Sequence, residues 1–506
     1  MTAPVITSES TASTITGVVD RRFGQVVWHF RGITYGHIPK RFASPEYVAL
    51  REGEVDATRF GPQCPQPRVD VGHLLRIPPD VPISPHIAED EFGCLNLNIT
   101  CPPRTNSSDV TLLPVLVWVH GGSQCVTFAS AASPVCDPTH LVAHAAGINK
   151  PLIVVTFNYR LNIFAFGDGT GQCNLALRDQ RVALEWVSKN IASFGGDANR
   201  ITLAGESAGA VYVHAHLLNK NRVPVQRAIL SSGSLHLSPP QPHGVGERLI
   251  SRLVDELASR GDTLQNATAE SLVQALVNCG IVSMWLQQEP GLDEWDIRTE
   301  RVDALMVSDV EYESIIWRNG VEGMATEQII STIRNGKDEP TEIEKLYHIY
   351  PGRPTSSRNG VLDFMNDTRF ALPALEICER WRQAGRQDIF QYIVDEPNPW
   401  QVSSRAHHAV DLILLFGGID LSFNPGAAKV GSKMRETWAE FVRGGRPWES
   451  SMVQAFGPHG RCEELTLQEY AGRRRAGHFE HLKELGASQC RALSGSLGMG
   501  RLSLLN

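Results

Sequence analysis

Apolar residues in this chain gather in short, nearly continuous runs that are followed by longer amphipathic segments. Residues 114–120 and 152–159 are such runs, and strands of this kind belong to parallel sheets that are covered on both faces. Over residues 178–194 the apolar positions recur at helical spacing, and a strand over residues 201–204 and a second helix follow. This alternation predicts an α/β protein with a large, mostly parallel central sheet flanked by helices.

The rest of the chain adds further segments to this sheet. The middle part, about 240–350, is polar and amphipathic, so we expect a helical cap inserted over the sheet of a single domain, 1–506. A strand pattern returns over residues 389–394, and the tail, about 462–506, predicts one surface helix whose basic cluster faces solvent. The stretch 65–87 is rich in Pro, Asp and Val and predicts a surface loop.

The composition is that of an ordinary globular protein. Of the 506 residues, 42% are hydrophobic and 20% are charged, and the formal net charge is −8. Nothing in this balance suggests nucleic acid or an acidic membrane surface as a partner. No stretch approaches the roughly 20 consecutive apolar residues that a membrane-spanning helix needs. The first residues show no signal-peptide pattern, so we expect a cytoplasmic protein, with secretion as the alternative.

The sequence predicts neither a metal site nor a cofactor. The ten cysteines are scattered without a Cys-x-x-Cys pair, which argues against a zinc ribbon. His214 and His216 lie two positions apart on a predicted helix, so they do not share a face as zinc ligands would. The glycine-rich stretch 167–171 has the wrong spacing for a dinucleotide-binding fingerprint.

One short stretch carries the clearest chemical signal. The strand over residues 201–204 runs into the pentapeptide 205–209, Gly-Glu-Ser-Ala-Gly, which is the pattern of a serine at a sharp strand-to-helix turn. Such a turn exposes the hydroxyl of Ser207 as a nucleophile, and the amide of Ala208 points to the same space. A structural turn that merely contains a serine is the alternative, and the strand before and the helix after favour the catalytic interpretation.

The sequence around this serine resembles the signature of the type-B carboxylesterase and cholinesterase-like family, and other segments match in the family's order. The resemblance covers the chain from about residue 15 to about residue 450 and implies an α/β-hydrolase fold. The variant over residues 90–98 resembles the fungal branch of the family. The matching segments are 30–35 (FRGITY), 94–98 (CLNLN), 118–122 (WVHGG), 158–161 (NYRL), 179–187 (DQRVALEWV), 194–210 around the serine, 438–441 (WAEF) and 445–447 (GRP).

A catalytic base is expected further along the chain. A neutral serine is a poor nucleophile and needs a histidine that is oriented by a carboxylate. In α/β-hydrolases the chain order is Ser, then Asp or Glu, then His. His407 and His408 lie at the entry to an apolar run, and the family pattern His-x-x-Asp-Leu aligns with His408 and Asp411. The resemblance therefore implies that His408 is the base, and a surface loop histidine is the alternative.

The orienting acid is expected between the serine and the histidine. The segment 304–317 offers three carboxylates, Asp309, Glu311 and Glu313. The family places its acid before a small residue, a few positions past the end of a strand, and Glu313 followed by Ser314 fits that pattern, although glycine is usual after the acid. The resemblance implies that Glu313 holds the imidazole tautomer and stabilises the imidazolium.

The oxyanion hole needs two or three converging amides, and the loop over residues 120–125 is the expected source. By resemblance, the amides of Gly122, Ser123 and Ala208 converge on the oxyanion. The family usually has a glycine where Ser123 stands and an aromatic residue where Gln124 stands. Serine can still provide a backbone N–H there if its dihedral angles are permitted, although a side chain can narrow the hole or strain the turn.

Four supporting residues are implied by the resemblance alone. Glu206 looks like the family's buried glutamate that tunes the site, with a hydrogen bond to the turn as the alternative role. Ser232 resembles a family serine that hydrogen-bonds near the acid. Cys64 and Cys94 match two family cysteines that form a disulfide, although cysteines of a cytosolic protein more often stay reduced.

These patterns predict a serine hydrolase that cleaves small carboxylic esters through an acyl-enzyme intermediate and needs no cofactor. A lactonase, thioesterase or acyltransferase acting on a secondary metabolite is one alternative, because it would use the same triad with a different substrate or acceptor. A non-catalytic interaction protein, as the cholinesterase-like adhesion modules are, is the other alternative. Such modules typically lack the serine or the histidine, whereas this chain has all three residues.

Overall fold

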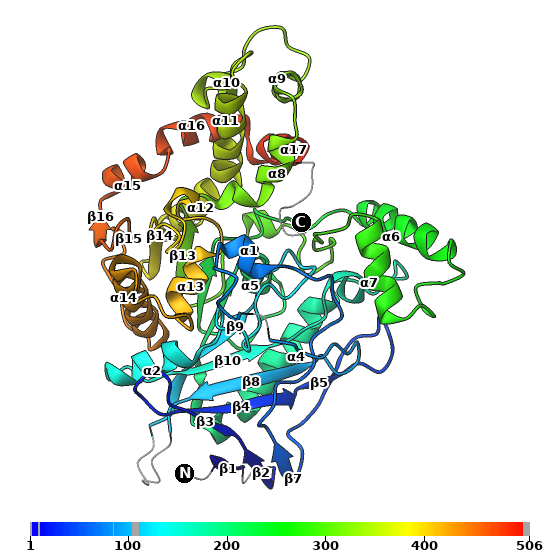
Figure 1. The fold of residues 1–506 in the computed structure, drawn as a ribbon, viewed down its shortest axis with the longest axis vertical. Helices are drawn as coiled ribbons and strands as arrows, with labels where there is room; N and C mark the ends of the chain where they lie inside the picture. Colours follow the sequence, from blue (N-terminus) through cyan, green and yellow to red (C-terminus); the bar gives the residue numbers. More distant parts are fainter. Residues whose placement is uncertain (1–2, 9–10, 84, 104–110, 499–506) are drawn as a thin grey trace.

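The computed structural model describes residues 3–8, 11–83, 85–103 and 111–498, and its centre is an 11-stranded sheet (Figure 1). The seven strands in the middle of this sheet pair in parallel with their neighbours. The outer strands, one at the β16 edge and three at the β3 edge, pair antiparallel. The predicted large, mostly parallel sheet is confirmed. Across the sheet the strands are β16 (Cys462–Leu465), β15 (Val453–Phe456), β14 (Ile389–Val394), β13 (Ala304–Val310), β12 (Arg227–Ser231), β11 (Gly196–Glu206), β9 (Leu113–Val119), β10 (Ile153–Phe157), β8 (Asn96–Cys101), β4 (Val27–Thr34) and β3 (Val18–Asp20).

Both faces of the sheet are covered by helices, which explains the continuous apolar runs in its strands. In β9, Val115 and Val117 pack into one hydrophobic cluster, whereas Leu116 and Trp118 pack into another on the opposite face. The first cluster includes residues of α4 (Leu175–Asn190), α5 (Ala208–Leu218) and α12 (Leu372–Gln383). The second includes residues of α2 (Thr139–Gly147), α13 (Val410–Phe416) and α14 (Pro425–Val442).

Smaller elements surround this core. The stretch 65–87, predicted as a loop, contains the short helix α1, whose first turn is capped by Asp70 through a 2.9 Å hydrogen bond from the amide of His73. The other small elements are a sheet of β1 (Val5–Ser8), β2 (Ser13–Thr16) and β7 (Gly53–Asp56), a pair of β5 (Gly36–His37) and β6 (Glu46–Tyr47), and the helices α1 (Val71–Leu75), α3 (Asn162–Phe166), η1 (Ile191–Phe194), η2 (Trp295–Ile297), η3 (Glu313–Trp317), η4 (Asp367–Ala371) and η5 (Val402–Ser404).

The helical cap predicted for about 240–350 is not one continuous insertion, because β13 lies within that range. This strand pairs with β12 and β14 in the sheet, and all seven of its residues are buried. Its short apolar stretch is flanked by long amphipathic segments, which dominate the sequence pattern. Two groups of helices therefore stand in place of one cap.

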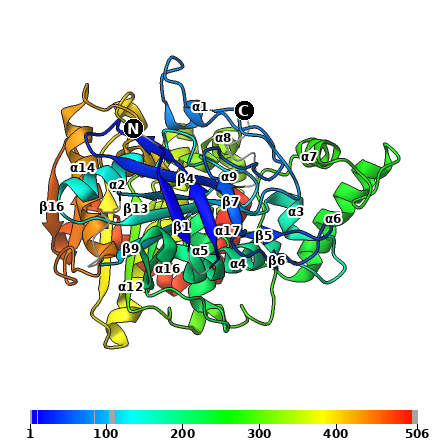
Figure 2. The same cartoon turned by 90° about the horizontal axis from the view of Figure 1, so that it is seen from below.

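The two helical groups lie apart from each other. α6 (His243–Ala258) and α7 (Ala269–Asn278) pack against the main core, at the opposite end of the molecule from α14 and β16 (Figure 2). The second group, which follows β13, forms a hydrophobic cluster of its own at the top of Figure 1. It consists of α8 (Arg318–Glu322), α9 (Thr326–Arg334), α10 (Glu342–Leu346) and α11 (Pro354–Asn366).

The tail, about 462–506, is more ordered than the predicted single helix. It begins with the edge strand β16 and continues with α15 (Leu467–Arg473), α16 (Ala476–Leu485) and α17 (Ala487–Leu497). Phe479 and Leu497 join the hydrophobic cluster of the second helical group. Packing against partners distant in sequence thus stabilises helices whose own patterns are weak.

The basic cluster of the tail does not lie fully in solvent, so that prediction was wrong. Arg474 is only 3% exposed. Its guanidinium donates a short hydrogen bond to Asp309 and a 2.8 Å hydrogen bond to Oδ1 of Asp395. The two carboxylates lie at the ends of β13 and β14. Arg474 compensates the buried charge of Asp309 and shares Asp395 with Arg473, which pairs with Oδ2 of Asp395 at 2.9 Å.

Cys64 and Cys94 are neighbouring, buried free thiols, so the disulfide implied by the resemblance is not formed in this structure. The hydrogen bond with Cys64 and burial raise the pKa of Cys94 well above its usual range. The sulfur of Cys64 also accepts a 3.3 Å hydrogen bond from the amide of Leu161. Both cysteines therefore act as packed core residues here.

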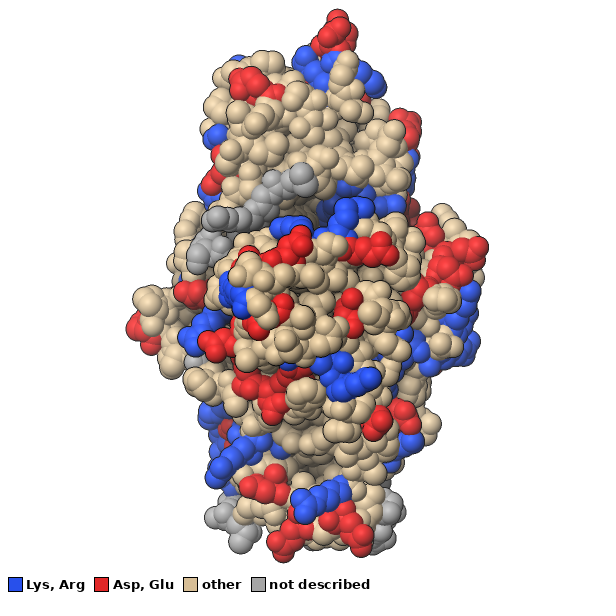
Figure 3. Space-filling view, turned by 90° about the vertical axis from the view of Figure 1, so that its right-hand side faces the viewer, with Lys and Arg blue, Asp and Glu red and all other residues tan. Residues whose placement is uncertain are grey.

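On the face shown in Figure 3, Lys and Arg side chains are interspersed with Asp and Glu side chains. None of the helices in the described ranges is long and apolar enough to cross a membrane.

The Arg474 contacts generate a stability prediction. The substitution Arg474→Met leaves Asp309 buried without its ion-pair partner, while Asp395 keeps Arg473, so we expect the free energy of unfolding to fall by about 3–5 kcal/mol. Arg443→Met removes the same charge from an exposed position. This control is expected to change the free energy of unfolding by less than about 0.5 kcal/mol. Urea unfolding of the three proteins measures this difference. Equal stabilities of the two variants would contradict the ion-pair argument.

Candidate active site

Ser207 occupies a strained position between β11 and α5. Its φ is 56° and its ψ is −123°, a region that residues with side chains rarely adopt. The amide of Ser207 donates a 3.0 Å hydrogen bond to the carbonyl of Ser231 on the neighbouring strand. A Cβ at Gly205 would lie 2.5 Å from the carbonyl carbon of Gly209, and one at Gly209 would lie 2.1 Å from the carbonyl oxygen of Val119. The sharp turn predicted from the pentapeptide therefore depends on both glycines.

The structure brings His408 to this serine. Its Nε2 lies 2.9 Å from Oγ of Ser207, and its Nδ1 forms a short hydrogen bond with Oε2 of Glu313. The other oxygen of Glu313 accepts a 2.8 Å hydrogen bond from the amide of Val310, at the end of β13. The three residues predicted as nucleophile, base and acid are thus in contact, although 201 positions separate the histidine from the serine.

The neighbouring His407 has a different environment. Its Nδ1 donates a 2.9 Å hydrogen bond to the carbonyl of His408, so its Nε2 accepts the 2.9 Å hydrogen bond from Nδ2 of Asn398. Burial lowers the pKa of His407 to about 4, so the ring is neutral. Only His408 of this pair reaches Ser207, which agrees with the alignment of the sequence pattern.

Carboxylates surround the imidazole of His408. Oε1 of Glu206 lies 3.2 Å from its Nε2. Burial by itself lowers the pKa of His408, but the charges of Glu206 and Glu313 outweigh burial and raise it to about 9. Burial also raises the pKa of Glu206 to about 8 and that of Asp411 to about 6. This environment stabilises a protonated imidazole strongly.

Ser232, which the resemblance places near the acid, lies beside a serine that does bond a carboxylate. Oγ of Ser231, the last residue of β12, donates a 2.8 Å hydrogen bond to Oδ2 of Asp411. The hydroxyl of Ser232 has no hydrogen-bond partner among the described residues. Ser232 leaves the strand with a φ of 49°, so its backbone already belongs to the following turn. Ser231, not Ser232, therefore makes the hydrogen bond to a carboxylate.

The loop after β9 faces Ser207 across the same cavity. Gly122 has a φ of 119°, and a Cβ there would lie 2.0 Å from the carbonyl oxygen of Val126, so only glycine fits. Ser123 and Gln124 both have positive φ values, 55° and 61°, in the left-handed region. Ser123 thus adopts the conformation for which glycine is usual.

The amides proposed for the oxyanion hole have no competing acceptor. Within the described part of the chain, the N–H groups of Gly122, Ser123 and Ala208 donate no hydrogen bond to protein. The two loop residues line the same cavity as Ser207. Donors held by the backbone and left unpaired beside a nucleophile suit a developing oxyanion.

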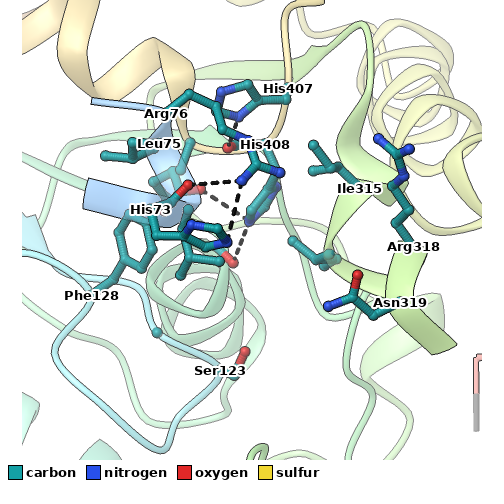
Figure 4. Close-up of a pocket in the computed structure, with 16 residues that line it drawn as sticks. His73, Leu75, Arg76, Ser123, Phe128, Ile315, Arg318, Asn319, His407 and His408 are labelled. Carbon is teal, nitrogen blue, oxygen red and sulfur yellow. Dashed lines mark hydrogen bonds and ion pairs between the residues drawn. The ribbon is translucent and has the colours of Figure 1, made fainter. Parts of the chain in front are cut away.

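A cavity of about 100 Å³ opens over the serine and the histidine (Figure 4). Its walls come from α1, the loop after β9, and the segment that includes η3 and the start of α8. The contribution of α1 was not expected from the sequence, which predicted a surface loop there. Its apolar lining includes Leu75, Phe128, Ile315 and Ile316.

A serine, a histidine and a carboxylate connected in this way, at a strand-to-helix turn of a mostly parallel sheet, are the arrangement of an α/β-hydrolase of the serine type. The sequence also matches the description "Carboxylesterase family" over residues 3–277. The chain belongs to this family and is a carboxylic ester hydrolase. This confirms the predicted recognition and the predicted α/β-hydrolase fold.

Similar proteins come from fungi and bacteria. The chain is 30% identical to Lipase 3 of Yarrowia lipolytica (strain CLIB 122 / E 150) over 492 residues, which cover 93% of this chain and 95% of the relative. It is 26% identical to para-nitrobenzyl esterase of Bacillus subtilis (strain 168), covering 85% of this chain and 90% of the relative. It is 34% identical to inactive carboxylesterase-like protein VdtD of Byssochlamys spectabilis, and this match covers 55% of this chain and 46% of the relative. The serine, the histidine and the carboxylate of the site are in contact in this chain.

The steric demand at the turn generates a prediction. A methyl group in Gly209→Ala meets the carbonyl oxygens of Val119 and His120 at 2.1 and 2.9 Å, so we expect a loss of at least about 2 kcal/mol of stability and slower reaction of Ser207 with a fluorophosphonate. Gly477 is the matched control, because it also follows an alanine at the start of a helix and has nothing within 4 Å of a Cβ.

Gly477→Ala is expected to leave stability unchanged or to raise it by up to about 1 kcal/mol. Thermal unfolding and the labelling rate are measured for both variants. If Gly209→Ala behaved like Gly477→Ala, the close approach of α5 to β9 would not hold the turn.

Proposed function

We propose that this enzyme hydrolyses small carboxylic esters through an acyl-enzyme intermediate, with Ser207 as nucleophile, His408 as general base and Glu313 as orienting acid. The 2.9 Å contact between Oγ of Ser207 and Nε2 of His408 supports this proposal most directly. The hydrogen bond between Nδ1 of His408 and Glu313 keeps the N–H on Nδ1 and the lone pair on Nε2.

The first half of the cycle forms the acyl-enzyme. Nε2 of His408 removes the proton of Ser207 while Oγ attacks the ester carbonyl, and the resulting oxyanion accepts hydrogen bonds from the amides of Gly122, Ser123 and Ala208. The tetrahedral intermediate collapses as the protonated His408 donates its proton to the departing alkoxide oxygen. Glu313 remains ionised and stabilises the imidazolium.

The second half releases the acid. Water gives a proton to Nε2 of His408 and attacks the acyl carbonyl, and a second tetrahedral intermediate forms in the same amide pocket. Its collapse returns the proton to Oγ of Ser207 and frees the carboxylic acid. The apolar side chains of Leu75, Phe128 and Ile315 along the cavity favour the aliphatic or aromatic parts of an ester.

The contacts favour catalysis over a non-catalytic interaction role. An interaction protein needs no unpaired amides beside an activated serine and no histidine within 2.9 Å of its hydroxyl. Lactone hydrolysis, thioester hydrolysis or acyl transfer would use the same groups, since each differs only in the bond attacked or in the acceptor. Ester hydrolysis is the reaction that the family supports.

Replacing the nucleophile tests the proposal. Ser207→Ala is expected to lower kcat for 4-nitrophenyl butyrate by at least about a thousandfold and to abolish labelling by a fluorophosphonate. Ser232→Ala is the matched control, because it removes a buried hydroxyl that has no hydrogen-bond partner among the described residues. The control should keep both readouts within about threefold. Substantial turnover by Ser207→Ala would identify another nucleophile.

The pH dependence of activity tests the base. His408 accepts a proton only when its ring is neutral, and the neighbouring carboxylates raise its pKa to about 9. We therefore expect kcat/KM to be low in acid and to rise with pH toward pH 9. Glu206→Gln removes one of these charges, so the midpoint of the rise should move to lower pH by about one unit.

Glu311→Gln provides the control for this shift. Glu311 lies on the same segment as Glu313 and pairs with Arg405 at 2.8 Å. It is not among the main charges that raise the pKa of His408. Its pH profile should match that of the wild type. A midpoint that stays in place or moves to higher pH in Glu206→Gln would contradict the electrostatic account.

A further inference from the structure

Arg76 lies at the mouth of the active-site cavity. It is the residue directly after α1 and adopts a left-handed conformation with a φ of 56°. Its amide donates a 3.2 Å hydrogen bond to the carbonyl of His73, and the amide of Ile77 bonds the carbonyl of Gly72 at 2.9 Å. These bonds fix the backbone, and the partly buried side chain lines the same cavity as Ser207 and His408.

The position of Arg76 is tied to that of the base. The carbonyl of Leu75 accepts a 2.6 Å hydrogen bond from Nδ2 of Asn398. The same amide group of Asn398 bonds Nε2 of His407, and His407 in turn bonds the carbonyl of His408. A continuous chain of hydrogen bonds therefore connects the residue before Arg76 with the residue that contacts the nucleophile. The backbone that carries Arg76 is therefore held at a defined place relative to His408.

The guanidinium of Arg76 keeps hydrogen-bonding capacity. Its Nη1 donates a 3.0 Å hydrogen bond to the carbonyl of His73 and lies 3.4 Å from Nε2 of the same residue. An arginine carries five N–H donors in a planar fork. No carboxylate of a described residue forms an ion pair with Arg76, whereas Arg318 pairs with Glu322 at 2.7 Å and Arg405 with Glu311 at 2.8 Å. Arg76 is thus a cavity-lining cation with donors left over.

Charge changes sign along the cavity. Glu206 and Glu313 surround the imidazole at its floor, so a negatively charged group has no favourable place there. Figure 4 shows Arg76 and His73 on the wall formed by α1, close to His408, and Ile315 and Asn319 on the opposite wall. A substrate whose ester lies at the floor can therefore extend a negatively charged group toward the guanidinium.

We propose that Arg76 binds a carboxylate carried by the substrate, so that this enzyme prefers esters that bear a second, negatively charged group near the scissile bond. The inference rests on the ester hydrolysis proposed above and adds a substrate class to it. The planar guanidinium matches a carboxylate in a two-point hydrogen-bonded pair, and the partly buried site strengthens that pair. Arg76 is a binding residue in this account and takes no part in the chemical steps.

Two matched substrate pairs test the proposal. On the alcohol side the pair is 3-(butyryloxy)benzoate and its primary amide, and on the acyl side it is mono-4-nitrophenyl adipate and the corresponding adipamate ester. Each pair differs in one charge at nearly constant shape. The ratio of kcat/KM for carboxylate over amide is compared between proteins, so the intrinsic reactivity of each ester cancels.

In at least one pair this ratio is expected to fall by about ten- to hundredfold in Arg76→Met. The loss should appear mainly as a higher KM for the carboxylate ester, while the amide ester keeps its kinetic constants. Arg76→Lys should retain part of the preference, and Arg76→Glu should reverse it. The pair that responds identifies the side of the ester that carries the charge.

Two controls separate this role from general effects. Arg68→Met removes the same charge from an exposed position of the same stretch and should leave the ratio unchanged. If Arg76 only caps the carbonyl of His73, Arg76→Met should lower the melting temperature. It should also lower kcat/KM for the carboxylate ester and for the amide ester of each pair by the same factor. A ratio that stays within threefold in both pairs would overturn the proposal.

Binding without turnover distinguishes this inference from the proposed function. Calorimetry with Ser207→Ala should show that 3-hydroxybenzoate binds more tightly than 3-hydroxybenzamide, or that adipate binds more tightly than adipamate. This difference in affinity should disappear in the double variant Ser207→Ala with Arg76→Met. Carboxylate-selective binding without ester turnover by the wild type would refute the proposed function alone. Ester turnover without any selectivity in rate or binding would refute the role of Arg76 alone.

Discussion

The site depends on a backbone conformation that only a tightly packed junction can hold. Ser207 lies in a region of φ and ψ that costs of order 1–3 kcal/mol for a residue with a side chain. β11, α5 and β9 approach one another at Gly205 and Gly209 more closely than any Cβ would allow. The packing of the sheet against the two glycines therefore maintains the strained conformation of Ser207. Its result is a hydroxyl raised above the carboxyl ends of the parallel strands, where loops from distant segments meet.

Charge in a buried environment is the second constraint. His408 is surrounded by Glu206, Glu313 and Asp411, and the charges of all three raise its pKa despite burial. In the proposed mechanism this arrangement favours the imidazolium that forms as the serine loses its proton, and activity then depends on the neutral ring at higher pH. Arg76, proposed as the carboxylate-binding residue, places the opposite sign at the mouth. Floor and mouth thus attract different parts of a substrate.

Features with a local cause were predictable from the sequence. The turn at Ser207 follows from small residues within five positions, and the central strands follow from continuous apolar runs. His408 and Glu313 were assigned through family resemblance, since only motif order connects them to the serine. The sequence pattern did not separate β13 from the cap, because long amphipathic segments flank this strand, although its seven residues are all buried.

Features that depend on distant partners were not predictable. Arg474 is buried because Asp309, 165 positions away, meets it in the folded chain. The hydrogen bond that fixes Leu75, beside Arg76, comes from Asn398, 323 positions away. The hydrogen bond of Ser231 to Asp411, 180 positions away, was not expected from the sequence. No local pattern encodes such contacts, which arise only from tertiary packing.

The central claim is that the contacts of Ser207 with His408, and of His408 with Glu313, make this one hydroxyl the site of acyl transfer. The most direct measurement is to quench the enzyme in acid during turnover of 4-nitrophenyl butyrate, digest it and locate the trapped butyryl group by mass spectrometry. The account predicts a butyryl ester on the peptide that contains Ser207, at that residue, formed in step with a burst of nitrophenol. A butyryl group on a different residue, or turnover with no acylated peptide under conditions where deacylation is slow, would contradict it.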